Sequence, residues 1–252
     1  MNQPELRSYR TFYESHAWEQ LTEIESQRLN ATVAHVPAGT EAILEIGCGD
    51  GRFSSMLPQA RFVGVDYSFS ALQNFRARNG LCAQGSAHAL PFPSRSFDLV
   101  VCTEVLEHLP SEIFRGTLDE INRVARRYVL ISVPFAENLG EQTARCQHCK
   151  LKSHRYGHVR NFDAAALRGL FGPHLSLFDT WTMGPSVGSW FAPLLWFRGP
   201  TSSQGTCLHC GRVFSATPTL RERVATRLHT ELIAPWRKKP YWIGGVYRRM
   251  GV

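Results

Sequence analysis

The chain has 252 residues, of which 43% are hydrophobic, and carries a formal charge of +7. This length suits one α/β domain with insertions, or one domain with a small appendage, and the hydrophobic content is ample for a core. No apolar run reaches the length of about eighteen residues that a membrane span needs, and the first residues lack the apolar segment of a secretory signal, so we expect a cytoplasmic protein with no membrane span.

Much of the positive charge lies in the C-terminal third. A net charge of this sign is a hint about association with anions. Basic residues there alternate with apolar ones, as on a solvated helix face or strand, and we favour that interpretation over a nucleic-acid groove. A nucleic-acid partner therefore stays possible but is not favoured. The residues concerned are Arg221, Arg223, Arg227, Arg237, Lys238, Lys239, Arg248 and Arg249.

Residues 5–34 are polar and favour helix, and they include four aromatic residues. Tyr9 and Tyr13 are four residues apart and share a helix face, so they are candidates to face a ligand. The alternative is a helix that covers one edge of a sheet. The other two aromatic residues are Phe12 and Trp18.

A strand, a glycine turn and a helix follow each other from Ile43. Residues 43–46 predict a short buried strand, residues 47–51 a Gly-x-Gly-x-Gly turn, and residues 52–57 the start of a helix. Glycine permits positive φ and close approach of a ligand to the backbone. A second apolar strand, 62–66, ends in Asp66, where dinucleotide folds place an acid on ribose hydroxyls. The pattern is neither Gly-x-Gly-x-x-Gly nor a P-loop, which disfavours a pyrophosphate or triphosphate site.

The remaining elements continue a βα alternation. Helices are expected over 68–78, 111–124 and 163–171, the first capped by Ser68 or Ser70 and the last by Asp163. The further strands are expected over 81–86, 97–103, 128–133, 175–181 and 241–248. The fourth strand is apolar enough to be covered on both faces, and its carboxyl end is where open α/β sheets bind ligands.

Four stretches in this order resemble the class I S-adenosylmethionine-dependent methyltransferases. They are residues 45–51 (EIGCGDG), 65–68 (VDYS), 89–93 (ALPFP) and 96–109 (SFDLVVCTEVLEHL). The match is closest to the type-11-like subgroup, which acts mostly on small molecules, and it covers residues 40–135 well and the remainder loosely. The resemblance implies an α/β fold: a Rossmann-like, seven-stranded, mostly parallel sheet with helices on both faces and the last strand antiparallel between the fifth and sixth.

The resemblance also implies an organisation for the chain. Residues 1–252 are expected to be a single methyltransferase domain, with an N-terminal helical lid over 1–38 and a cofactor-binding half over 39–134. The family position of Ser86 commonly holds an acid that accepts from the adenine amino group, so a neutral hydroxyl is expected to bind more weakly. The implied binding residues for S-adenosyl-L-methionine are Glu45, Gly47, Cys48, Gly49, Asp66, Tyr67, Ser86, Ala87 and Thr103.

Two segments, 135–160 and 182–238, exceed this plan, and each contains a Cys-x-x-Cys pair. The pairs are Cys146/Cys149 and Cys207/Cys210. Four thiolates supply a closed, tetrahedral structural zinc site, so one zinc ion is expected to join both insertions into a substrate-recognition subdomain. Redox-active pairs and disulfides are the alternatives. A cytosolic setting disfavours structural disulfides, and neither pair has the thioredoxin-like context of a redox pair.

Methyl transfer from a sulfonium requires mainly alignment of the nucleophile with the methyl carbon. A base is needed only if the acceptor loses a proton. His108 and His158 are the candidate catalytic residues, with Glu104 as a further candidate. The alternatives are structural: His108 beside the cofactor, and His158 bonded to the backbone of the zinc loop.

We therefore expect transfer of a methyl group to an O or N atom of a small molecule such as a sugar, a lipid precursor or a secondary metabolite. One alternative is an RNA or protein methyltransferase that docks through the zinc insert and the basic C-terminal third. Another is a non-enzymatic binding module, which the intact glycine turn and Asp66 disfavour. The oligomeric state stays open. Aromatic residues that either line the acceptor pocket or form a local core are Trp181, Trp190, Phe191, Trp196 and Phe197.

Overall fold

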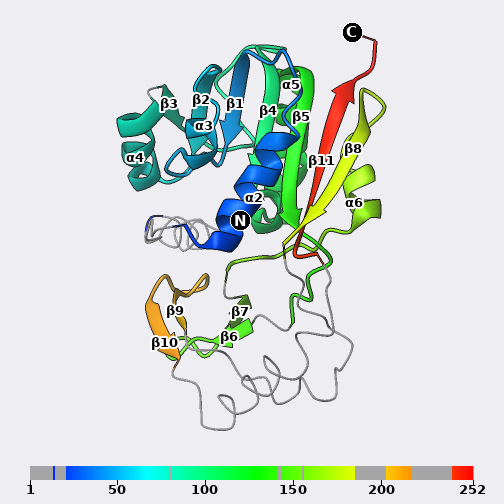
Figure 1. Cartoon of the computed structure of the whole chain (residues 1–252). Coiled ribbons are helices and arrows are strands. Elements are labelled where there is room, and N and C mark those ends of the chain that lie inside the picture. The colour runs from blue at the N-terminus through cyan, green and yellow to red at the C-terminus, as the bar shows by residue number, and fades with distance from the viewer. Residues whose placement is uncertain are drawn as a thin grey trace.

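The computed structural model describes residues 14, 21–79, 81–140, 143–154, 156–184, 203–216 and 240–251. These residues form one seven-stranded sheet in the order β3-β2-β1-β4-β5-β11-β8 and two separate two-stranded hairpins (Figure 1). The sheet strands are β1 (Ala42–Ile46), β2 (Arg61–Asp66), β3 (Cys82–Gln84), β4 (Phe97–Thr103), β5 (Ala125–Pro134), β8 (Leu175–Met183) and β11 (Trp242–Arg249). The hairpin strands are β6 (Thr143–Arg145), β7 (Lys152–His154), β9 (Ser203–Thr206) and β10 (Val213–Ala216). The helices are α2 (Glu23–Ala34), α3 (Arg52–Ser55), α4 (Phe69–Asn79), α5 (Ser111–Val124) and α6 (Ala164–Arg168), with a 3-10 turn η1 (Leu106–His108).

The topology confirms the predicted fold. Strands β1 to β5 pair in parallel, and β11 runs antiparallel to both of its neighbours, β5 and β8. The sheet therefore presents the carboxyl ends of its parallel strands along one edge, where such folds place ligands.

In the described part of the chain, no helix is long and apolar enough to cross a membrane.

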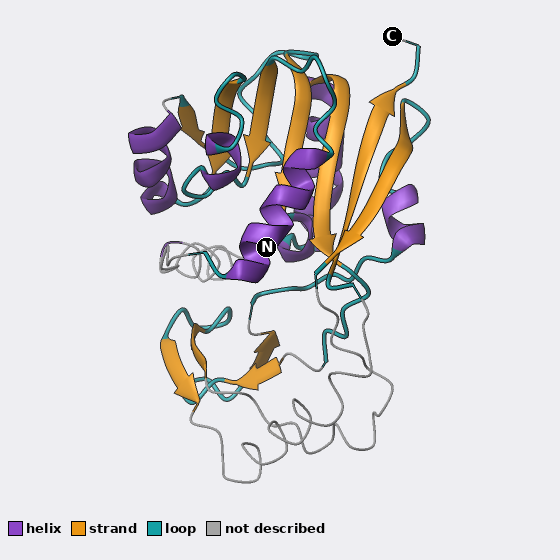
Figure 2. Cartoon of the chain, in the orientation of Figure 1, coloured by secondary structure: helices purple, strands orange, loops and turns teal. Residues whose placement is uncertain are grey.

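Successive residues of β4 pack into two different hydrophobic clusters, because side chains alternate between the faces of a strand. Val100 and Cys102 join the cluster that contains α5 residues, whereas Leu99 and Val101 join the cluster that contains Leu29 of α2. All four of these β4 residues are fully buried. Helices cover both faces of the sheet (Figure 2), which explains why this strand is apolar at consecutive positions.

Several predicted boundaries differ from the structure. The third strand is only Cys82–Gln84, because Ser86 instead forms an isolated bridge with Ala89 in the following loop. Helix α3 ends at Ser55, and Pro58 follows closely; a proline disfavours helical conformation in the residue before it. Strand β5 starts earlier than predicted, since the chain passes from α5 directly into it.

Helix α2 begins with a capping box, in which Thr22 and Glu25 each bond the other's backbone amide. Its residue Leu29 packs in the core with Ile43 and Leu99. This part of the predicted N-terminal helix thus covers the sheet. Four aromatic residues considered for the lid lie outside the described residues: Tyr9, Phe12, Tyr13 and Trp18.

Candidate functional site

The predicted glycine turn lies at the carboxyl end of β1. Gly47, Gly49 and Gly51 have φ angles of 69°, 53° and 80°, which glycine adopts at little cost. The amide of Gly47 donates to the carbonyl of Val65 at 2.8 Å, which fixes the turn against β2. A Cβ atom at Gly47 would lie 2.2 Å from Cγ2 of Val105, so the segment after β4 packs directly on the turn.

Asp66 connects the turn to the start of α4. Its Oδ2 accepts from the amide of Gly49 at 2.9 Å, and its Oδ1 accepts from the amide of Ser68 at 2.8 Å. Burial raises the pKa of Asp66, while these amides favour its ionised form. A carboxylate offers about four lone-pair positions, so each oxygen keeps one for a further donor. This arrangement suits the two hydroxyls of a ribose.

Glu45 lies beneath the turn, with only 4% of its surface exposed. Burial raises its pKa to about 8, against a hydrogen bond from Ser54 and with help from the charges of Asp66 and Asp50. The group is therefore largely protonated at neutral pH. Its contact with Ser54 of α3 makes it a support of the turn in this structure.

Replacing Glu45 with glutamine should alter how stability depends on pH. The pKa of the carboxyl is raised from 4.5 to about 8 in the fold. Its contribution to the free energy of unfolding is therefore most favourable below pH 4.5 and is lost as the pH rises through 8. The amide of glutamine does not titrate, so its contribution stays constant between these pH values. We expect denaturant unfolding to show Glu45→Gln gaining stability relative to the wild type as the pH rises. Parallel stability curves would contradict this assignment.

The other predicted cofactor residues occupy different environments. Tyr67 is 37% exposed, whereas Thr103 and Ala87 are half-buried. The hydroxyl of Ser86 hydrogen-bonds Nδ1 of His88 at 2.7 Å. The Cys48 thiol packs in a small core cluster with Leu72 and Phe75 and does not lie at the surface of the turn, so its position reflects packing.

Glu14 is a residue of this region that sequence reasoning missed. Its carboxylate accepts from the amides of Phe69 and Ser70 at 2.8 and 3.1 Å, at the start of α4. Ser68 caps the same helix, as predicted, by accepting from the amide of Ala71. Nothing local in the sequence signals the Glu14 contact, because its partners are more than fifty residues away.

A cluster of acids and histidines follows β4 and β5. The rings of His108 and His158 lie 4.8 Å apart, and the rings of His154 and His158 stack at 4.6 Å. Nδ1 of His158 donates to Oε2 of Glu137 at 2.5 Å, and Nε2 of His154 lies 3.3 Å from Oε1 of the same carboxylate. The structure thus brings both predicted catalytic histidines together. Sequence reasoning missed Glu137 and Glu107, which belong to the same cluster.

Burial and hydrogen bonds shift the pKa values of the groups in this cluster in different ways. Burial and the neighbouring His158 lower the pKa of His108 to about 3, so its imidazole is neutral at physiological pH. Burial raises the pKa of Glu137, but hydrogen bonds from His154 and His158 outweigh it and bring the value to about 2. An anionic carboxylate therefore fixes the orientation of His158, while His108 is unsuited to hold a proton.

Glu104 has a strained backbone at the end of β4, with a φ angle of 56°. Its Oε2 accepts from Nε1 of Trp242 at 2.8 Å, and burial raises its pKa. Non-glycine residues with positive φ cost free energy and concentrate at functional sites. This backbone conformation turns the chain after β4, and the next residue, Val105, packs on the glycine turn.

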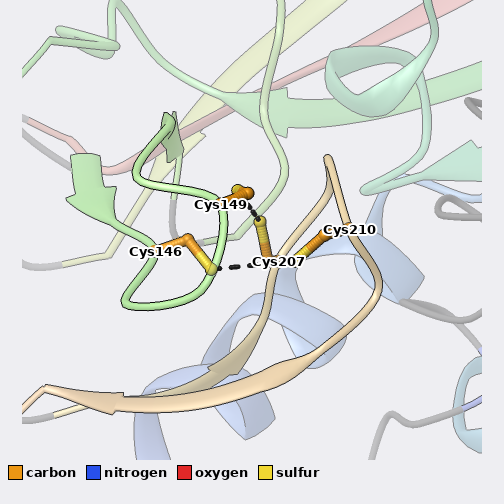
Figure 3. A group of neighbouring side chains, drawn as sticks. All are labelled: Cys146, Cys149, Cys207 and Cys210. Carbon is orange, nitrogen blue, oxygen red and sulfur yellow. Dashed lines mark hydrogen bonds between the residues drawn. The ribbon is translucent and has the colours of Figure 1, made fainter.

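The four cysteines of the two pairs converge, although the pairs are far apart in the sequence (Figure 3). Sγ of Cys146 lies 3.7 Å from Sγ of Cys210, and Sγ of Cys149 lies 3.6 Å from Sγ of Cys207. A tetrahedral zinc ion with Zn–S bonds of about 2.3 Å requires sulfur atoms separated by about 3.8 Å. The two sulfur atoms of a disulfide lie only about 2.05 Å apart. The described cysteines are all free, and these four fit a closed zinc site.

The two hairpins present their cysteines in the same way. Each pair lies on a turn, between β6 and β7 and between β9 and β10. The amide of Lys150 donates to the carbonyl of Cys146, and that of Gly211 to the carbonyl of Cys207. Lys150 adopts a φ of 62°, close to the 68° of Gly211. The amides of Cys149 and His148 bring the pKa of Cys146 to about 6 against the effect of burial, whereas burial raises the pKa of Cys207 to about 12. The arrangement of the four sulfur atoms, and not their titration, therefore indicates a metal site.

Two further predictions concern the aromatic residues considered for an acceptor pocket and the basic residues of the C-terminal third. Trp181 is buried in the core beneath α2 and stacks on His35 at 4.0 Å, so it packs as a core residue. Arg249 is buried and donates to the carbonyl of Ala125 at 2.9 Å, so its charge is used inside the fold. The residues of these two sets that lie outside the described part are Trp190, Phe191, Trp196, Phe197, Arg221, Arg223, Arg227, Arg237, Lys238 and Lys239.

Residues 44–131 match a family described as "Methyltransferase domain". Over 147 residues, the chain is 29% identical to malonyl-[acyl-carrier protein] O-methyltransferase of Legionella pneumophila, covering 54% of this chain and 49% of that protein. Over 101 residues, it is 35% identical to ubiquinone biosynthesis O-methyltransferase of Azoarcus sp., covering 36% and 43%. The chain spans less than half the length of each of these curated relatives.

Solved structures share the fold over nearly the whole chain. N-methyltransferase NodS of Bradyrhizobium japonicum, in complex with S-adenosyl-L-homocysteine, matches with a TM-score of 0.56 at 15% identity, covering 99% of this chain and 100% of its own. Magnesium protoporphyrin IX methyltransferase of Synechocystis, with bound S-adenosylmethionine, matches with a TM-score of 0.55 at 13% identity, covering 99% and 98%. At these identities the likeness concerns the fold.

Proposed function

Because residues 44–131 form a class I S-adenosylmethionine-dependent methyltransferase domain, we propose that this chain transfers a methyl group to an O or N atom of a small molecule. The observation that carries the proposal is Asp66, whose carboxylate bonds two backbone amides and keeps lone pairs for a ribose. Relatives named malonyl-[acyl-carrier protein] O-methyltransferase and ubiquinone biosynthesis O-methyltransferase support a small-molecule or carrier-bound acceptor.

The glycine turn and the ends of β1, β2 and β4 surround the proposed cofactor site. When bound, S-adenosyl-L-methionine supplies a methyl group already activated by its sulfonium. The chain then has to orient this group, which is the main contribution of proximity. In the proposal, Gly47 and Gly49 admit the cofactor, Asp66 holds its ribose, and Tyr67 flanks it. The remaining proposed contacts are Glu45, Cys48, Ser86, Ala87 and Thr103.

His108 and His158 are the proposed catalytic residues on the acceptor side. Both lie beyond the parallel strands that end at this edge, and Glu137 fixes the ring of His158. The imidazole of His158 offers a nitrogen lone pair to an acceptor hydroxyl or amine that loses a proton, and the neutral ring of His108 lies beside it. Their role is therefore to prepare the acceptor atom, while the cofactor side aligns the methyl group.

A zinc ion held by Cys146, Cys149, Cys207 and Cys210 is proposed as structural, since four sulfur ligands leave no open position. It would join segments 135–160 and 182–238 into a substrate-recognition subdomain of one methyltransferase domain. Of the lid expected over residues 1–38, the part that forms α2 packs on the sheet instead, so the proposed lid lies before α2. Free thiols in this number suit the cytoplasm, where we place the protein.

Purified protein with labelled S-adenosylmethionine and a fractionated cell extract tests the proposed activity. We expect label in small metabolites and no transfer by an Asp66→Ala variant. Label in RNA or protein would contradict the small-molecule assignment and support docking through the basic C-terminal third. If the cofactor binds but no fraction of the extract becomes labelled, the proposed activity is wrong for the acceptors tested, and a binding role gains support.

A further inference from the structure

We propose that Glu107, His108 and His158 bind a divalent transition-metal ion at the carboxyl edge of the sheet, separate from the four-cysteine site. One potential ligand atom from each of these residues lies within 4.8 Å of the others. They come from η1 and from the loop after β7, so the fold brings together residues that are far apart in the sequence. The proposal rests on the proposed function only for its catalytic consequence.

The first observation is the buried carboxylate of Glu107. Its side chain is fully buried, and neither carboxylate oxygen accepts a hydrogen bond from another residue in the described part of the chain. A buried carboxylate without a partner is costly, and proteins compensate by pairing it or by coordinating a metal. The backbone carbonyl of Glu107 accepts from the amides of Val159 and Arg160 at 2.8 and 3.2 Å, which fixes the carboxylate beside His158.

The second observation is that Glu137 fixes the ring of His158 through one of its two nitrogen atoms. Its Nδ1 donates to Oε2 of Glu137, so the lone pair of the imidazole lies on Nε2. A histidine that ligates a metal almost always donates its other ring N–H in this way, often to a carboxylate. Glu137 thus plays the part of an orienting residue for a metal ligand.

His154 distinguishes this group from a neighbouring one. Glu137, His154 and His158 also lie close enough together to hold a metal ion. However, Nδ1 of His154 accepts from the amide of His158 at 3.1 Å, so its Nε2 carries the hydrogen that faces Glu137. That second group is therefore a hydrogen-bonded support for His158, and the metal belongs with Glu107 and His108.

The ligand set selects the class of ion. Two imidazoles and one carboxylate suit zinc, manganese or iron, whereas magnesium and calcium prefer oxygen ligands. Three protein ligands leave positions open for an oxygen atom of the acceptor. A metal ion there would lower the pKa of a bound acceptor hydroxyl, so that its proton could pass to solvent and its oxygen could attack the methyl carbon as the C–S bond of the sulfonium breaks. In this way the two histidines act on the acceptor through the ion.

Manganese binding to the purified full chain, freed of weakly held metal, tests the proposal. Mn²⁺ is the probe, because thiolates of the four-cysteine site prefer softer ions. We expect electron paramagnetic resonance titration to show one Mn²⁺ site, with affinity lowered at least about 100-fold in Glu107→Gln and His158→Ala, and about 10–100-fold in Glu137→Gln. Glu112→Gln, which changes an exposed acid on the adjacent helix, is the matched control and should bind Mn²⁺ like the wild type.

The outcomes separate this proposal from the proposed function. Equal Mn²⁺ affinity in the wild type and Glu107→Gln, or no Mn²⁺ binding by the wild type, would overturn the metal site whatever the activity. Cofactor binding is measured in the same samples by calorimetry and should be unchanged in Glu107→Gln, which also shows that the variant is folded. A wild type that binds both Mn²⁺ and cofactor but methylates nothing would leave the metal site supported and overturn the proposed function.

Discussion

Replacement of Cys149 by serine should release the zinc ion and unfold the two hairpins, while the seven-stranded sheet stays folded. Structural zinc sites in small peptides have apparent binding free energies of roughly 10–16 kcal/mol, so loss of one ligand removes most of what orders such a unit. Among the described residues, the hydrophobic cluster at the hairpins consists of the four cysteines. The sheet, by contrast, has two large clusters of its own.

Metal analysis and limited proteolysis measure this effect. We expect the zinc content to fall from one ion per chain to nearly none, with new cleavage near the hairpins and a retained proteolysis-resistant sheet. Cys82→Ser is the matched control, since Cys82 is a partly buried cysteine outside the metal site. A Cys149→Ser protein that keeps its zinc and its resistance to cleavage would refute the zinc assignment.

Replacement of Asp66 by alanine should weaken S-adenosylmethionine binding by about 30- to 1,000-fold, which corresponds to roughly 2–4 kcal/mol. The substitution removes the proposed acceptor for the ribose hydroxyls. It also leaves the amides of Gly49 and Ser68 without their acceptor, so the turn loses its connection to α4. Calorimetric titration with the cofactor measures the change.

Asp98 provides a matched control for this experiment. It is a buried aspartate that also accepts from two backbone amides, those of Glu41 and Ala42, but it lies at the amino end of the strands and pairs with Arg126. We expect Asp98→Ala to lower thermal stability and leave cofactor affinity nearly unchanged. Equal affinity losses in both variants would mean that Asp66 acts through stability alone.

The sequence was sufficient to predict the fold because its signals are local. A short apolar strand, a glycine turn and an acid after the next strand specify one edge of a parallel sheet, and the strand order followed from the family resemblance. The ends of elements were harder to place. Lys150 shows the reason: it adopts the left-handed conformation that its counterpart Gly211 makes visible in the sequence, but a lysine gives no such signal.

Contacts across long sequence separations limited prediction of the site. The spacing of the two cysteine pairs predicted that four cysteines meet, and the histidines were identified as candidates through their position after strands. Three acids of this region, Glu107, Glu137 and Glu14, were not identified. The sequence alone does not show whether an acid is buried or which residues it contacts. Glu107 illustrates this: its side chain is fully buried, and neither of its carboxylate oxygens accepts a hydrogen bond from the residues that the structure describes.

The central position of β11 has a consequence for how the protein folds. Residues 242–249 lie between β5 and β8, so these two strands have no direct contact until β11 enters the sheet. During synthesis, a ribosome must therefore deliver more than one hundred residues after β5 before that strand gains its second neighbour. Pairing over such separations slows folding and leaves strand edges open to aggregation. We expect chaperone dependence to be greatest in this interval of translation.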